Sequence, residues 1–135
     1  MAVEIHPHHA AARRWMDDLT PGDEVVFTRA TQTSFLRLLT QPIAPGYEPV
    51  SQSRAWKLYA TFLEDDRVHW IPEPEGVEVL WRKLSAGSLP SPKLWMDAYL
   101  AAFAISAECR MVTFDRAFSQ FRRRGLDLLL LSETG

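Results

Sequence analysis

The sequence predicts an α/β fold with a mainly parallel central sheet, on three observations. Short runs rich in β-branched and aromatic residues alternate along the chain with segments of helical periodicity. The last run, residues 126–131, is almost continuously apolar, which is typical of a strand covered on both faces. The chain has 135 residues, 47% of them hydrophobic, so it can build a buried core. We therefore expect a single domain over residues 1–135.

The first half of the chain predicts helices at 7–19, 31–39 and 53–63, and strands at 24–28 and 68–71. In the first helix, Trp15 and Leu19 recur at helical spacing, and Pro7 fits a first turn. A turn at 20–23 separates that helix from the first strand. Prolines after residue 71 end the second strand.

The second half predicts helices at 77–84 and 116–123, and strands at 111–114 and 126–131. A further helix begins near residue 91, since Ser91 suits an N-cap and Pro92 suits the first helical position. Residues 94–105 of this helix carry one charge, Asp97. A helix that is apolar on all sides is expected to be buried.

A carboxylate in such a helix must be paired, must hold a cation or must be protonated, because an isolated buried charge is very costly. A second acid, Asp115, follows the strand at 111–114, and ligands gather at the carboxyl ends of parallel strands. Asp97 and Asp115 therefore suggest a shared Mg²⁺ or Mn²⁺ ion. Two structural alternatives stay open: Asp115 caps the helix at Arg116, and Asp97 pairs with Lys93 one turn away.

Other polar clusters give weaker signals. The histidines at 6, 8 and 9 lie at a helix start, without the converging partners that a zinc site needs. The arginines at 122–124 are read as a solvated helix end rather than a phosphate site. The five tryptophans, spread singly, are read as core rather than as a base-stacking platform.

The bulk properties favour a cytoplasmic protein. A net charge of −2 gives no global positive field, which argues little for or against nucleic-acid binding at an acidic metal site. The single cysteine, Cys109, cannot form an internal disulfide and fits a reducing compartment. No apolar run reaches the length of a membrane span, and residues 1–7 lack the features of a signal peptide.

Three segments, residues 31–40, 91–104 and 112–118, resemble PIN-domain proteins, in particular the VapC-type ribonuclease toxins of toxin–antitoxin pairs. The resemblance implies a three-layer PIN-like fold and Mg²⁺- or Mn²⁺-dependent cleavage of RNA. It implies that Asp97 and Asp115 are metal ligands and that Thr113 is a hydroxyl residue beside them. It implies as partners an RNA substrate, a cognate antitoxin and a second copy of the chain.

The chain departs from the family pattern at two places. Gln32 stands where the family usually has glutamate; its amide can ligate a metal or orient a water but brings no negative charge. The family also begins with a central strand that ends in an Asp-x-Asn motif, and residues 1–5 resemble the stretch after it. Glu4 follows no apolar strand, so it does not replace that aspartate. We therefore expect an N-terminally incomplete domain without its central strand, and the upstream reading frame tests this.

Our interpretation of the sequence is that the chain is a metal-dependent ribonuclease. Its predicted catalytic residues are Asp97, Asp115, Gln32 and Thr113. Loss of the first acid leaves the activity of this chain open. One alternative is a catalytically impaired PIN-like module that engages an antitoxin or a dimer partner. The other is a different metal-dependent phosphate enzyme on an α/β fold.

Overall fold

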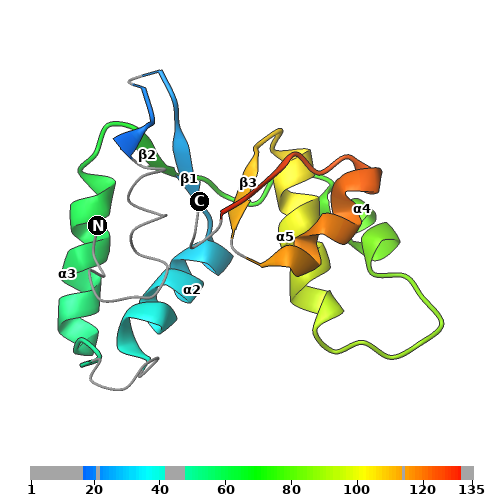
Figure 1. Cartoon of the computed structure of the whole chain (residues 1–135), viewed down its shortest axis with the longest axis horizontal. Helices are drawn as coiled ribbons and strands as arrows, with labels where there is room; N and C mark the ends of the chain where they lie inside the picture. The colour runs from blue at the N-terminus through cyan, green and yellow to red at the C-terminus, as the bar shows by residue number, and fades with distance from the viewer. Residues whose placement is uncertain (1–16, 21, 42–47, 114, 132–135) are drawn as a thin grey trace. The chain divides into compact units, whose positions relative to one another are not determined.

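The computed structural model describes residues 17–20, 22–41, 48–113 and 115–131 (Figure 1). The chain divides into two compact units, Met1–Pro72 with Glu133–Gly135, and Glu73–Ser132. The prediction of a single domain over residues 1–135 stays a prediction. The predicted helix at 7–19, except for its last three residues, and the histidines at 6, 8 and 9 lie outside the described residues.

The first unit alternates strands and helices in the predicted order. Its elements are β1 (Val25–Phe27), α2 (Arg29–Thr40), α3 (Gln52–Leu63) and β2 (Val68–Trp70). The two strands pair in parallel, with Val25 opposite Val68 and Phe27 opposite Trp70. The four elements predicted between residues 24 and 71 are confirmed, with ends shifted by at most two residues.

Aromatic side chains fill the space between the helices and the strand pair of the first unit. Phe27, Phe35, Tyr59 and Phe62 meet largely edge to face, with ring centroids 5.4–6.2 Å apart. Leu39 and Ala55 are buried beside them. Large aromatic rings therefore separate α2 and α3 from β1 in this unit.

The second unit contains α4 (Val77–Leu84), α5 (Leu94–Ser106), β3 (Met111–Thr113), η1 (Arg116–Arg124) and β4 (Leu128–Leu130). Its strands also pair in parallel, with Met111 opposite Leu128. The α4 prediction is confirmed at both ends. The basic helix at 116–123 is present, but as a 3₁₀-helix.

The predicted N-cap of α5 is wrong. The helix begins at Leu94, after a turn at 92–93, and the Leu94 N–H donates to the Ser91 carbonyl at 3.1 Å. Lys93 occupies the N-cap position in a helical conformation and makes no capping bond with its side chain. Pro92 is accommodated in the turn, where its fixed φ fits as well as it does in a first helical turn.

Buried alanines and one pair of rings line the contact of α5 with α4. Trp81 of α4 and Tyr99 of α5 meet edge to face, with ring centroids 5.3 Å apart. Ala98, Ala101 and Ala102 are fully buried in a cluster with Val77 and Leu84. Figure 1 shows α4 and α5 side by side within this unit. Small side chains let two helices approach closely, so the start of α5 is supported by a rigid pair.

The prediction that the tryptophans are core is wrong for three of them. Trp56, Trp70 and Trp95 are exposed, while Trp81 is half-buried and donates its indole N–H to the Trp95 carbonyl at 2.9 Å. Periodicity placed each ring on an amphipathic helix or strand but did not decide whether a neighbour covers it. Trp15 lies outside the described residues.

The α/β class and the parallel strand direction are confirmed. Within the described ranges the strands form two separate two-stranded sheets, β1–β2 and β3–β4. The expected loss of a central strand stays a prediction. None of the described helices is both long enough and apolar enough to cross a membrane.

Candidate active site

Asp97 lies in the first turn of α5 and is half-buried. Within the described part of the chain its carboxylate has no hydrogen-bond or ion-pair partner. Burial raises the pKa of Asp97; the attraction of Lys93 lowers it, and the repulsion of Asp115 raises it again. The carboxylate is thus partly desolvated and lies within electrostatic range of a second acid and a cation.

Asp115 follows β3 and caps η1. Its Oδ1 accepts the Ala117 N–H at 2.9 Å, and its own N–H donates to the Thr113 Oγ1 at 3.1 Å. The structural alternative, a helix cap, is therefore confirmed for Asp115. Because one oxygen serves the cap, the other, Oδ2, remains to face a cation.

That second oxygen lies near a lysine. The Lys93 Nζ is 3.6 Å from Asp115 Oδ2, and the lysine side chain is 72% exposed. The suggestion that Lys93 pairs with Asp97 is wrong in this respect, since its ion pair is with Asp115 and it acts on Asp97 through longer-range attraction. The residues at 91–93 form a turn, and this turn carries the lysine toward the start of η1 rather than along α5.

The donors collected here are hard oxygens. The two carboxylates come from α5 and from the N-cap of η1, and the Thr113 hydroxyl comes from the last residue of β3. Among the described residues, no group of three or more acidic, histidine or cysteine side chains could hold a metal ion. A pair of repelling carboxylates still fits a divalent cation with several waters, because Mg²⁺ is commonly bound through one or two carboxylates.

Gln32 belongs to the first unit, in α2. Its side chain is 93% buried (7% exposed), and Oε1 accepts a bond of 2.7 Å from the Arg29 Nη1. The guanidinium of Arg29 lies 4.9 Å from the centroid of the Trp70 ring. Gln32 is therefore held as an acceptor to arginine, and its predicted role beside the two acids stays a prediction.

Threonines order the start of α2. The Thr28 N–H donates to the Thr31 Oγ1 at 2.8 Å, and the Thr31 N–H donates back to the Thr28 Oγ1 at 3.3 Å. The reciprocal bonds satisfy two free donors of the helix start. They fix the turn on which Arg29 and Gln32 stand.

Sequence reasoning missed the roles of Lys93 and Arg29. The spacing of Arg29 and Gln32, three residues apart in a helix, was a usable signal for their contact. Lys93 gave no comparable signal, because its partner lies 22 positions further along the chain.

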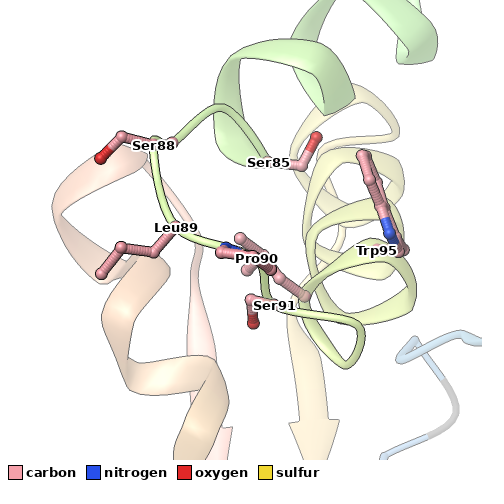
Figure 2. A pocket seen from close by; sticks show the side chains of 8 residues that line it. Ser85, Ser88, Leu89, Pro90, Ser91 and Trp95 are labelled. Atoms are coloured by element: carbon pink, nitrogen blue, oxygen red, sulfur yellow. The ribbon is translucent and has the colours of Figure 1, made fainter.

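A separate pocket lies between the end of α4 and the start of α5 (Figure 2). Its volume is about 240 Å³, and its lining includes Ser85, Ser88, Leu89 and Trp95. Neither Asp97 nor Asp115 lines it. The acid pair therefore lies outside this pocket.

Comparison with known proteins gives consistent matches. The PIN domain family model matches residues 2–124. Ribonuclease VapC41 of Mycobacterium tuberculosis (strain ATCC 25618 / H37Rv) is 44% identical over 98% of this chain and 92% of its own length. Ribonuclease VapC31 of the same strain is 32% identical over 86% of this chain and 82% of its own. A chain in the crystal structure of VapBC2 from Rickettsia felis, bound to a DNA fragment from their promoter, superposes with a TM-score of 0.63. That chain shares 14% identity, over 95% of this chain and 90% of its own.

Proposed function

Since this chain belongs to the PIN-domain family, in its VapC-type branch, we propose that it is a metal-dependent ribonuclease, the toxin of a toxin–antitoxin pair. Relatives of similar length named as ribonucleases support the reaction class. The observation that carries the proposal is the partly desolvated Asp97, which has no ion-pair partner among the described residues and lies within electrostatic range of Asp115.

Asp97 and Asp115 are the residues to hold Mg²⁺ or Mn²⁺, through the Asp97 carboxylate and Asp115 Oδ2. The cation supplies positive charge that offsets the charge developing on the phosphate oxygens. The cap bond from Ala117 and the Thr113 hydroxyl fix Asp115 in place. Lys93 partly neutralises the acid pair and, being mostly exposed, is free to move toward an incoming phosphate.

The partners follow from family membership. We propose RNA as the substrate, a cognate antitoxin as the inhibitor and a second copy of the chain as a dimer partner. Light scattering of the purified protein alone and with the product of a neighbouring small gene tests the last two. A mass of one chain under both conditions contradicts them.

A cleavage assay tests the activity. Purified protein is incubated with mixed-sequence RNA in Mg²⁺, in Mn²⁺ and in chelator. We expect cleavage with either metal, none in chelator, and a loss of at least about 100-fold in Asp97→Asn and Asp115→Asn.

Asp127→Asn is the matched control, because Asp127 is an exposed acid of the same unit that pairs with Arg110. It should cleave at the wild-type rate. Cleavage that survives both chelator and Asp97→Asn contradicts the proposal. An absence of cleavage together with retained partner binding identifies the chain as a binding module.

A further inference from the structure

A shallow groove runs between α2 and α3 in the first unit. Its volume is about 290 Å³, and its lining includes Arg29, Gln32, Thr33, Arg37, Gln52 and Trp56. Both helices contribute, so the groove depends on their packing around Leu39 and Ala55. None of the described residues that line it is acidic.

The charges of these two helices are all of one sign. The 24 residues of α2 and α3 contain four cationic side chains and no acid, although the whole chain has a net charge of −2. Arg29 and Arg37 line the groove, whereas Arg54 and Lys57 stand elsewhere on α3. The groove therefore carries local positive charge, although the net charge of the whole chain is negative.

Arg29 is held in position before any ligand arrives. Its Nη1 donates to the buried Gln32 at 2.7 Å, and its guanidinium stacks over Trp70 at 4.9 Å. A guanidinium fixed in this way loses little side-chain entropy when it binds an anion. Its remaining N–H groups are suited to a phosphate.

Trp56 supplies a second kind of contact. The indole lines the groove and is 55% exposed. An exposed aromatic face beside cations is the arrangement with which proteins hold single-stranded nucleic acid, since bases stack on the ring and phosphates meet the cations. The amides and hydroxyls of Gln32, Gln52 and Thr33 add hydrogen-bonding groups to the same surface.

We propose that the α2–α3 groove binds single-stranded RNA, with Arg29 and Arg37 on phosphates and Trp56 stacked on a base. This deepens the proposed function, because it assigns a binding surface for the same class of substrate. Charge alone also suits an acidic peptide. The solvent-facing indole beside the arginines favours RNA, because a base can stack on the ring while the adjoining phosphates meet the cations.

Binding is measured by fluorescence anisotropy with a labelled single-stranded RNA of about 12 nucleotides, within the usual range of site sizes. Chelator is present, so that the RNA stays intact. Trp56→Ala should weaken binding by roughly tenfold, and Trp56→Phe should retain most of the affinity. Arg37→Gln and Arg29→Gln should each reduce the slope of log affinity against log salt by about 0.7.

The control variants are in α3, the helix that also carries Trp56. Arg54→Gln and Lys57→Gln remove identical charges outside the groove and should change affinity less than Arg37→Gln. Arg37 and Trp56 are exposed, so their variants should fold, and circular dichroism verifies this. Arg29→Lys keeps the charge but loses the planar contact with Trp70, and should bind more weakly than wild type.

Three outcomes overturn the inference. The wild-type protein fails to bind the RNA, or the groove variants bind no more weakly than the Arg54 and Lys57 controls. Alternatively, poly-glutamate competes as well as RNA and Trp56→Ala has no effect, which assigns the groove to an acidic peptide. Cleavage assays on the same variants separate the two proposals. If the groove variants bind RNA more weakly but no variant and no wild-type protein cleaves it, the RNA-binding proposal stands and the ribonuclease proposal is contradicted. If the protein cleaves RNA but the groove variants bind it as well as the wild type does, the ribonuclease proposal stands and the RNA-binding proposal is contradicted.

Discussion

The two units share a plan, a parallel strand pair with helices, but the candidate sites within them carry charges of opposite sign. In the first unit α2 and α3 hold only cations, and the groove between them is positive and aromatic. In the second unit the only charge within α5 is Asp97, and Asp115 caps η1. A nuclease needs both kinds of surface, cations for the phosphates of the strand and acids for the metal. The small net charge of −2 is therefore no argument against nucleic-acid binding.

The cores differ as well. Four aromatic rings pack between the elements of the first unit. In the second unit, fully buried alanines lie between α4 and α5 beside one ring pair, Trp81 and Tyr99. Because buried interiors are close-packed, we expect this contact to hold the start of α5, and with it Asp97, in place. The following variants test this comparison.

The largest effects are expected from core truncation in each unit. Phe121→Ala in the second unit should reduce the free energy of unfolding by about 3–5 kcal/mol, and Leu39→Ala in the first by about 2–5 kcal/mol. Hydrogen exchange should show faster exchange in α4 and α5 for Phe121→Ala, and in α2 and α3 for Leu39→Ala. Equal loss of protection in all four helices with both variants contradicts a division into two units. Leu89→Ala, at an exposed site, is the control.

Overpacking the alanine interface should cost less. Ala102 is fully buried, so Ala102→Leu adds volume to a packed interior. We expect the free energy of unfolding to fall by about 1–3 kcal/mol. Ala60→Leu, at an exposed position of α3, makes the same change without a buried neighbour and should be close to neutral. Urea unfolding of both variants gives the comparison, and an equally neutral Ala102→Leu would show that the interface is loose.

Removing the charge of Asp97 should raise stability. The pKa of Asp97 is raised in the folded protein, so the folded state holds the proton more tightly than the unfolded state does. Its contribution to stability therefore falls as pH rises through this range, and the charged form is a net cost at neutral pH. Asp97→Asn should melt above the wild type at pH 7 without metal, and the difference should vanish below pH 3.8. A variant that melts lower at pH 7 contradicts the partial desolvation of this carboxylate.

The smallest effect is expected from Asp65, a half-buried acid of the first unit, with the opposite sign. Hydrogen bonds from Arg67, its guanidinium first, lower the pKa of Asp65 to about 2. The folded state therefore favours the ionised form, and this stabilisation is present above pH 3.8 and is lost as pH falls through about 2. Asp65→Asn should be slightly less stable than wild type at pH 6 and indistinguishable well below pH 2. A difference that persists well below pH 2 would show that the side chain acts by its shape rather than by its charge.

The bounds of the helices and strands were predicted better than the burial of their side chains. The bounds of α4 could be predicted because its apolar residues recur at helical spacing and Pro72, Pro74 and Gly76 precede it. The start of α5 was placed too early, because Ser91 and Pro92 are equally good turn residues and only the fold decides between the two. Exposure of Trp56 and Trp95 depends on whether another element covers them, and periodicity carries no such information.

The candidate site was predictable in part. Asp97 and Asp115 stand out by their apolar settings, and the structure brings them within electrostatic range of each other. The ion pair of Lys93 with Asp115 depends on how a turn meets a 3₁₀-helix 22 residues later. No local pattern encodes such a distance.

Calorimetric titration of Mn²⁺ tests most directly whether Asp97 and Asp115 hold one cation together. We expect one site in the wild type, an affinity at least about tenfold lower in each single variant to Asn, and no further loss in the double variant, because the two acids act as a unit. Asp127→Asn should bind as the wild type does. Unchanged Mn²⁺ affinity in Asp97→Asn, or independent and additive losses in the two single variants, would contradict a shared site.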